Sequence, residues 1–290
     1  MVFPKLPAKA AYLVLDNLPN RNALSAQVLG DLRQQLLEYN TPSGETAPLL
    51  LPDFRPDLLD RVFRRRPFGY RLGQDRDQFT KYNWLKDVKK WRARRGELPQ
   101  VLVLRSEGLH FSDGGDQNFS LCAEVMSLIR QSPIPVVGAI QGRATAAGAQ
   151  LALATDLPVA VGSARFQLPG MSIGLPCISA SAVLSRKLGN AFTYRMFALG
   201  EAIRADELPA GVVEIVTKST LDERVLQIAD QLANQSSAQA LAQAMGKWAY
   251  WTQVQIPNYS VAARWAAMAM TVPARIDDPD NPEEKGGLFY

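Results

Sequence analysis

Two loops rich in small residues have the pattern that best suits chemistry. One covers residues 109–116 and follows the apolar segment 101–104, and the other covers residues 141–150 and follows the apolar segment 135–140. Each apolar segment predicts a buried strand, and the small residues from Ala146 onward predict a helix start. A helix start leaves backbone N–H groups without partners and carries partial positive charge. If the loops lie side by side, two N–H groups could hold one carbonyl oxygen while negative charge develops on it.

Small residues between a strand and a helix are also common for packing reasons alone. The order and spacing of several motifs nevertheless resemble the enoyl-CoA hydratase/isomerase (crotonase) superfamily. Within it, the sequence is most similar to the enoyl-CoA hydratase domain-containing branch that lacks both catalytic glutamates. The motifs lie at residues 22–25, 111–116, 135–142, 147–156, 164–175 and 198–213. The resemblance therefore extends over most of the chain, apart from the segment 41–97 and the C-terminal end.

The resemblance implies an α/β fold with a crotonase-type ββα spiral core and a C-terminal helical region that builds trimers, sometimes doubled to hexamers. On this basis the spiral core spans residues 1–215, with a basic insertion at residues 41–97, and the helical region spans residues 216–290. Near the start, Ser25 is suited to cap a helix that runs to about residue 39. Apolar periodicity in the helical region predicts helices at residues 222–242, 245–252 and 259–270.

The resemblance also implies a catalytic site. The backbone N–H groups of Gly115 and Ala147 would hold the oxygen of a coenzyme A thioester and stabilise an enolate. Hydratases of the family use two glutamates, and their positions match Gln150 and Gly170 here. An amide takes no proton at physiological pH and glycine has no side chain, so the two-carboxylate hydration mechanism is not available. Gln150 could orient a water or the substrate, or satisfy nearby backbone, and Gly170 could leave space for an external anion.

Four residues are assigned to substrate and coenzyme A binding. Arg21 matches a family position near the coenzyme phosphates and suits a phosphate, although an arginine in a surface turn also serves as a solvated charge. Asp113, Gly114 and Gly170 complete the set, with Asp113 better suited to fixing its loop than to carrying protons. The resemblance implies no permanently bound cofactor, because coenzyme A enters as part of the substrate. No metal site is predicted.

The loss of both glutamates requires another proton carrier. His110 is of a residue type that often transfers protons in enzymes, but its place before the first loop favours a packing or surface role. Asp113 and Asp116 lie in the first loop, and Cys177 lies where some relatives have an acidic residue. None of these residues has the position of a family acid, so the proton carrier is left open.

The insertion carries most of the positive charge of the chain. Residues 41–96 contain 14 Lys plus Arg against 7 Asp plus Glu, a net charge of +7, compared with +4 for the whole chain. Prolines make its first half irregular, and residues 77–95 predict a helix. Three interpretations compete: a solvated amphipathic helix, a funnel for the coenzyme phosphates, or an RNA-binding surface. We favour the first and do not expect RNA binding, because no base-reading motif accompanies the charge.

Composition and hydropathy decide between globular, disulfide-rich, membrane and secreted proteins. With 47% hydrophobic and 21% charged residues, the sequence is typical of a globular protein, and two cysteines are too few for a disulfide framework. No apolar run approaches the roughly 20 residues needed to span a bilayer, and the start lacks a secretory signal. We therefore expect a cytoplasmic protein without membrane association.

The resemblance, with the loss of both glutamates, implies an acyl-CoA-binding, crotonase-like protein. We favour an atypical enoyl-CoA hydratase or isomerase, a lyase or isomerase of fatty acid metabolism that acts through an oxyanion-stabilised enolate. One alternative is a non-catalytic protein that binds acyl-CoA or serves as a scaffold. A further alternative is a ring-closing enzyme of the Dieckmann type, similar to naphthoate synthases, which the run Gly-Gly-Asp-Gln at residues 114–117 and Gly170 suggest.

Overall fold

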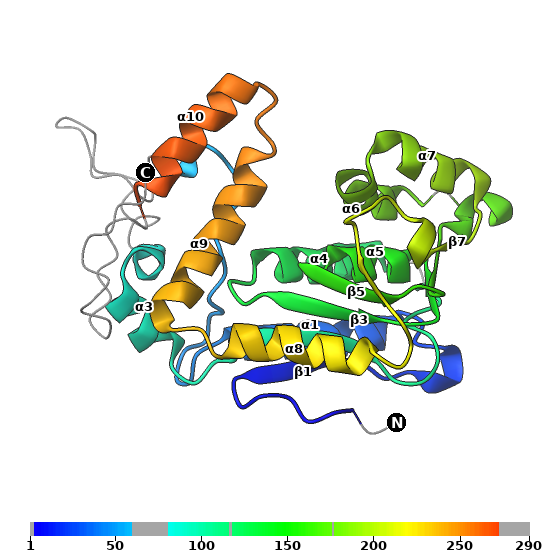
Figure 1. Ribbon diagram of the computed structural model, residues 1–290, viewed down its shortest axis with the longest axis horizontal. Coiled ribbons are helices and arrows are strands. Elements are labelled where there is room, and N and C mark those ends of the chain that lie inside the picture. The colour runs from blue at the N-terminus through cyan, green and yellow to red at the C-terminus, as the bar shows by residue number, and fades with distance from the viewer. Residues whose placement is uncertain (1–2, 60–80, 116–117, 176, 273–290) are drawn as a thin grey trace. The chain divides into compact units, whose positions relative to one another are not determined.

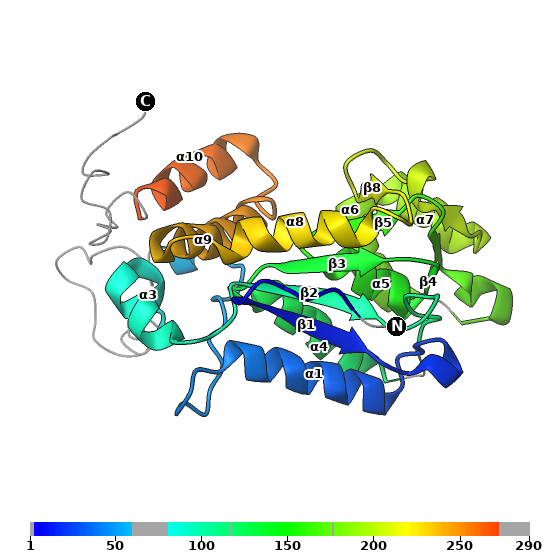
Figure 2. The same ribbon diagram turned by 60° about the horizontal axis from the view of Figure 1, so that its bottom comes forward.

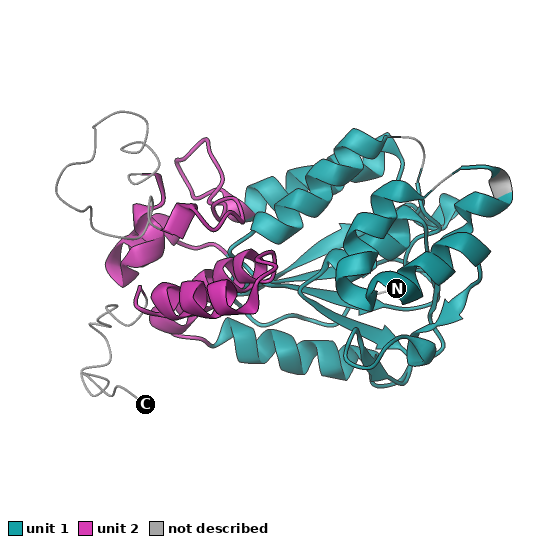
Figure 3. Cartoon of the chain, turned by 90° about the horizontal axis from the view of Figure 1, so that it is seen from above, with its two compact units in different colours: residues 1–39, 99–234 teal, residues 40–98, 235–290 magenta. Residues whose placement is uncertain are grey.

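A computed structural model describes residues 3–59, 81–115, 118–175 and 177–272. The chain divides into two compact units, residues 1–39 with 99–234 and residues 40–98 with 235–290 (Figure 3). The sequence-based boundary between residues 215 and 216 falls within the last strand of the first unit. The basic insertion belongs to the same unit as the part of the chain from residue 235 onward.

A five-stranded parallel sheet forms the centre of the first unit, in the order β1-β2-β3-β5-β8. Both faces of β2 and β3 are buried, which explains why these strands are continuous apolar runs in the sequence. The strands are β1 (Ala10–Leu15), β2 (Val101–Ser106), β3 (Val136–Ile140), β5 (Leu157–Val161) and β8 (Glu214–Val216).

Helices cover the two faces and one edge of this sheet. Helix α8 (Leu221–Ala233) packs its apolar stripe on valines of β2, β3 and β5, and α4 (Phe119–Gln131) lies on the opposite face (Figure 2). At the β1 edge, the Gln35 side chain of α1 (Ala26–Asn40) accepts from the Val14 N–H and donates to its carbonyl. The Ser25 hydroxyl accepts from the Val28 N–H, so the predicted cap and helix are confirmed.

A second, three-stranded sheet turns away from the first after β3 and again after β5. Its strands are β4 (Arg143–Thr145), β6 (Arg165–Gln167) and β7 (Ile203–Arg204), with β4 parallel and β7 antiparallel to β6. The chain thus repeats a strand, a second strand and a helix: β3-β4-α5 is followed by β5-β6-α6. Helices α5 (Ala147–Ala154), α6 (Ile178–Leu188) and α7 (Asn190–Leu199) pack in succession (Figure 1). This repeat is the predicted ββα arrangement.

In the described part of the first unit, three short 3₁₀ segments link these elements. They are η1 (Leu18–Asn20), η4 (Pro169–Ile173) and η5 (Ala205–Glu207). The first precedes the motif at residues 22–25, and the second contains Gly170, which was predicted to belong to the site.

Indole side chains organise the second unit. The Trp248 side chain of α9 (Ser237–Gln253) donates to the Asp53 carbonyl, and Trp265 of α10 (Tyr259–Met270) donates to the Pro56 carbonyl. Trp84 and Trp91 stack with their centroids 5.4 Å apart, on η3 (Asn83–Lys86) and α3 (Val88–Arg95). All four indoles are buried in one cluster, so a few large side chains hold the insertion segments against the C-terminal helices of this unit.

Two predicted helices are interrupted, and capping side chains explain both breaks. Within residues 77–95 the described part forms η3 and α3, because Asp87 is extended and its carboxylate accepts from the Lys89 and Lys90 N–H groups. The prediction of one helix over residues 222–242 is also wrong. Ser236 begins α9 with a capping box that pairs it with Gln239, so α8 and α9 are separate helices.

Candidate functional site

The two loops that the sequence singled out lie side by side. Ser112 and Ala144 form a parallel bridge, in which Ser112 donates its N–H to the Arg143 carbonyl and accepts from the Thr145 N–H, each at 2.9 Å. The Ser112 hydroxyl also donates to the Asn22 carbonyl at 2.7 Å. The first loop is therefore held by backbone bonds to the second loop and by a bond to the motif at residues 22–25.

Glycines allow this close approach. A Cβ at position 148 would lie 2.6 Å from the Ser112 carbonyl oxygen, and a Cβ at position 114 would lie 2.9 Å from the Thr145 carbonyl oxygen. Gly114 also has a φ of +92°, a conformation that other residues rarely adopt. Gly114 therefore shapes the loop, and nothing in the structure tests its predicted contact with a substrate.

Ala146 makes the turn from β4 into α5. Its φ of 49° and ψ of −116° are unusual for a residue with a Cβ, and its N–H donates to the Gln167 carbonyl at 2.8 Å. This bond to β6 holds the strained turn in place. As a result Ala147 becomes the first residue of α5, and its N–H points out of the helix start.

The two predicted donors are open in this arrangement. Among the described residues, no backbone carbonyl accepts from the Gly115 or Ala147 N–H. Gly115 is exposed and Ala147 is half-buried. Leu24 pairs with Gly115 through a parallel bridge in which the Leu24 N–H donates to the Gly114 carbonyl, which leaves the Gly115 N–H unused. Both amides can therefore donate to a ligand.

Gln150 and Gly170 have different surroundings. The Gln150 side chain lies one turn into α5 and is 4% exposed, and its Oε1 has no hydrogen-bond partner among the described residues. A buried acceptor of this kind requires a donor from water or a ligand. By contrast, a Cβ at position 170 would lie 1.9 Å from the Leu175 carbonyl oxygen and 2.6 Å from the Cys177 Sγ. A side chain is therefore excluded at position 170, and nothing in the structure tests the expectation that an anion binds beside it.

Asp113 joins the motif near Arg21 to the two loops. Its carboxylate accepts from the Arg21 Nη1 at 3.1 Å and from the Arg143 Nη2 at 2.8 Å. The carboxylate is therefore engaged by two guanidinium groups, which suits a positioning role better than proton transfer. Sequence reasoning assigned Arg21 and Asp113 separately to substrate binding and did not pair them.

Asn22 is a buried residue whose role the sequence did not reveal. Its side-chain amide donates to the Glu107 and His110 carbonyls, at 2.7 and 2.9 Å, and accepts from the Asn17 N–H. Its place in the Asn-Ala-Leu motif was the available signal. Asn22 fixes the start of the first loop relative to the preceding turn.

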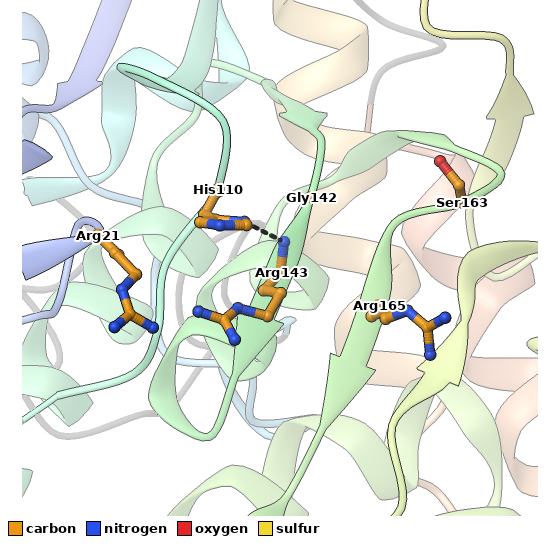
Figure 4. Close-up of a pocket in the computed structure, with 6 residues that line it drawn as sticks. All are labelled: Arg21, His110, Gly142, Arg143, Ser163 and Arg165. Carbon is orange, nitrogen blue, oxygen red and sulfur yellow. Dashed lines mark hydrogen bonds between the residues drawn. The ribbon is translucent and has the colours of Figure 1, made fainter.

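A basic cavity of about 550 Å³ lies beside these loops (Figure 4). Its lining residues are Arg21, His110, Gly142, Arg143, Ser163 and Arg165. Arg143 and Arg165 were absent from the predicted site. Their places as the first residues of β4 and β6 were the only signal that could have indicated them. Of the other proton carriers considered, Cys177 is half-buried and contacts the backbone near Gly170, and Asp116 lies outside the described residues.

Two negative findings come from the described part of the chain. Its helices are all too short or too polar to cross a membrane. No group of three or more His, Cys, Asp or Glu side chains within it could hold a metal ion.

Comparisons with known proteins agree with the fold. A family model described as enoyl-CoA hydratase/isomerase matches residues 99–262. The chain is 33% identical over 187 residues to the mitochondrial enoyl-CoA hydratase domain-containing protein 3 of Rattus norvegicus, which covers 59% of this chain and 61% of the relative. It is 37% identical over 116 residues to the 2,3-dehydroadipyl-CoA hydratase of Escherichia coli, over 38% of this chain and 46% of the relative. The matches thus span less than two thirds of these relatives.

Solved structures show the same architecture. The human enoyl Coenzyme A hydratase domain-containing protein 3 superposes with a TM-score of 0.66 at 25% identity, over 92% of this chain and 89% of that chain. An enoyl-CoA hydratase from Bacillus anthracis superposes with a TM-score of 0.69 at 19% identity, over 96% and 92%. The predicted crotonase fold is confirmed. Because the family model covers more than half of its length, the chain belongs to the enoyl-CoA hydratase/isomerase family.

Proposed function

We propose that the protein binds acyl-CoA thioesters and acts as an atypical enoyl-CoA hydratase or isomerase through an enolate. The observation that carries this proposal is the bridge between Ser112 and Ala144, beside which the Gly115 and Ala147 amides have no backbone acceptor within the described residues. Family membership and the names of the relatives support coenzyme A thioesters as the ligand class.

The amide pair would act on the thioester oxygen. Removing a proton next to the carbonyl, or adding a nucleophile in conjugation with it, moves electrons onto that oxygen. Preformed N–H donors stabilise this charge, and the loss of one such donor typically lowers kcat by about 10²–10³. Backbone donors suit the task because the fold fixes them before the substrate binds.

Gln150 would position a reactant. Its buried Oε1 can accept a hydrogen bond from a water or from a substrate N–H or O–H, but the amide cannot take up a proton. Gln150 is therefore proposed to orient the molecule that exchanges the proton. This differs from the paired carboxylates by which hydratases of the family move protons.

Proline at position 147 tests the proposal directly. It removes the N–H, and proline is well tolerated at the first position of a helix, where that N–H has no partner in the helix. The matched control is Ala147→Gly, which keeps the donor. We expect Ala147→Pro to lower turnover of a short enoyl-CoA about 100-fold or more, with both variants folded by circular dichroism.

The readouts also separate two classes of function. Equal turnover in the two variants would contradict the oxyanion role. The second candidate, a non-catalytic acyl-CoA binder, is favoured by the absence of a carboxylate at positions 150 and 170. It predicts a one-site calorimetric isotherm with coenzyme A and no turnover by the unmutated protein. The ring-closing alternative remains a further proposal, which no contact among the described residues favours.

We further propose that the protein assembles as a homotrimer or a hexamer. Large apolar side chains are exposed on two helices of the second unit, with Tyr250 of α9 55% exposed and Tyr259 and Met270 of α10 85% and 68% exposed. Such side chains are common at subunit interfaces. Light scattering would give the mass of the assembly.

A further inference from the structure

A row of arginines that the thioester site does not use crosses the three-stranded sheet, and two of them, Arg143 and Arg165, line the basic cavity. Arg143 pairs with Arg165 across β4 and β6, and Arg165 pairs with Arg204 across β6 and β7. Residues directly paired across strands have side chains on the same face of a sheet. Ala144 and Phe166, the next residues along, are fully buried, so the arginines lie on the face away from the core.

The two outer arginines have carboxylate partners and the central one does not. Arg143 pairs with Asp113, and Arg204 forms two bonds with Asp206. No carboxylate in the described ranges pairs with Arg165, although it has an arginine opposite it on both sides. Like charges in directly opposite positions repel each other. An anion bound at Arg165 would offset this repulsion.

The cavity adds further positive charge and donors around Arg165. Its lining contains three guanidinium groups, those of Arg21, Arg143 and Arg165, and Asp113 shares one carboxylate between the first two. Figure 4 shows Arg143 between Arg21 and Arg165, with Ser163 on the β6 side. Three positive charges against one negative charge leave this cavity with an excess of two.

His110 lines the same cavity, and one hydrogen bond holds its ring. Its Nδ1 accepts from the Arg143 N–H at 3.3 Å, so the neutral ring carries its proton on Nε2. Gly142 allows this contact, because a Cβ there would lie 2.8 Å from the His110 Nδ1 and 2.0 Å from the Leu109 carbonyl oxygen. The backbone of the turn before β4 therefore fixes the position of the His110 ring.

We propose that this cavity is a phosphate-binding site centred on Arg165. Guanidinium groups match the oxygens of a phosphate with paired hydrogen bonds, and the Ser163 hydroxyl and the His110 Nε2–H supply neutral donors. The volume of about 550 Å³ admits a ligand larger than inorganic phosphate, such as a nucleotide. Arg143 and Arg165 come from β4 and β6, whereas Arg21, His110 and Ser163 come from neighbouring loops. None of these side chains is a donor proposed for the thioester oxygen.

The experiment compares two arginine variants by titration with inorganic phosphate, followed by phosphorus NMR at constant ionic strength. Arg165→Gln removes the central charge, and Arg195→Gln removes an exposed charge of α7 that is 3.9 Å from Glu201. We expect Arg165→Gln to weaken phosphate binding about tenfold, and Arg195→Gln to change it less than twofold. Equal weakening in both variants, or no phosphate binding by the unmutated protein, would overturn the proposal.

Coenzyme A and dephospho-coenzyme A distinguish the source of the phosphate. If Arg165→Gln weakens binding of coenzyme A but not of the form without the 3′-phosphate, the site holds the coenzyme's own phosphate. If neither is weakened while inorganic phosphate is, the ligand is a separate phosphorylated molecule. Both results support the site. Ala147→Pro should leave phosphate binding unchanged, so failure of the oxyanion proposal is measured independently.

Discussion

The site loops and the basic insertion are held by different kinds of contact. Backbone bridges and close glycine contacts fix the loops around Ser112 and Ala144. In the insertion, contacts between side chains fix the structure. Arg94 makes a bidentate ion pair with Glu45, and the Arg95 guanidinium lies 5.3 Å from the centroid of the Trp91 ring. Most of the sequence's basic excess lies in the insertion, but these described charges already have partners. Arg165, which has no carboxylate partner among the described residues, lies in the first unit, where the sequence shows no charge run.

This difference teaches that net charge along a sequence does not identify the charges available to a ligand. A charge becomes available when its neighbours leave it unpaired. That depends on contacts between distant residues such as Arg94 and Glu45, and on strand register such as that of Arg143 and Arg165. Substitutions in the site loops and in the insertion test this difference separately.

The largest expected effect is at Gly148, where the loops touch. Gly148→Ala places a Cβ 2.6 Å from the Ser112 carbonyl oxygen, and backbone on both sides restricts relaxation. We expect the free energy of unfolding to fall by about 2 kcal/mol, and turnover to fall with it, because the bridge beside Gly115 is displaced. Urea unfolding and steady-state kinetics measure the two effects.

Gly246→Ala in α9 is the matched control. Nothing lies within 4 Å of a Cβ at this position, and alanine favours a helix interior over glycine. This variant should therefore be as stable as the unmutated protein or gain up to about 1 kcal/mol. If Gly148→Ala behaved in the same way, the loops would not depend on close backbone contact.

The glycines also explain which parts were predictable. Glycine and turn residues report local backbone conformation, so the strand ends, the loop pair and the helix start at Ala147 could be read from the sequence. Buried strands were predictable for the same reason, because their apolar runs are continuous. The capping of α3 by Asp87 and the filling of space beside Gly170 by Leu175 depend on conformations that composition does not encode.

A smaller effect is expected from Lys86 in the second unit. Burial, with a lesser contribution from Lys90, lowers its pKa from 10.5 to about 8. Between these values the unfolded chain holds a proton that the folded chain has released, so stability rises with pH from about 8 to 10.5. Below pH 8 the charged, half-buried ammonium opposes folding.

Lys86→Met removes this cost. We expect it to raise the free energy of unfolding at pH 7 by about 1 kcal/mol, a value reduced to allow for solvent screening, and to flatten the rise above pH 8. Lys89→Met, at an exposed position of α3, is the control and should change neither quantity. Urea unfolding at pH 7, 9 and 10 measures both. Parallel pH profiles for Lys86→Met and the unmutated protein would show that the lysine is solvated in the folded state.

The smallest effect is expected at Arg94, and it bears most directly on the comparison. Its ion pair with Glu45 is about one third exposed on each side, at 37% and 33%, and a pair of this kind contributes about 0.5 kcal/mol. Arg94→Gln and Glu45→Gln should each lower stability by that amount, and the double variant should lose no more than either alone. Phosphate and coenzyme A titrations should be unchanged by all three, because the pair is internal to the second unit. If Arg94→Gln instead weakened phosphate binding as much as Arg165→Gln, the positive charge of the insertion would contribute to ligand binding.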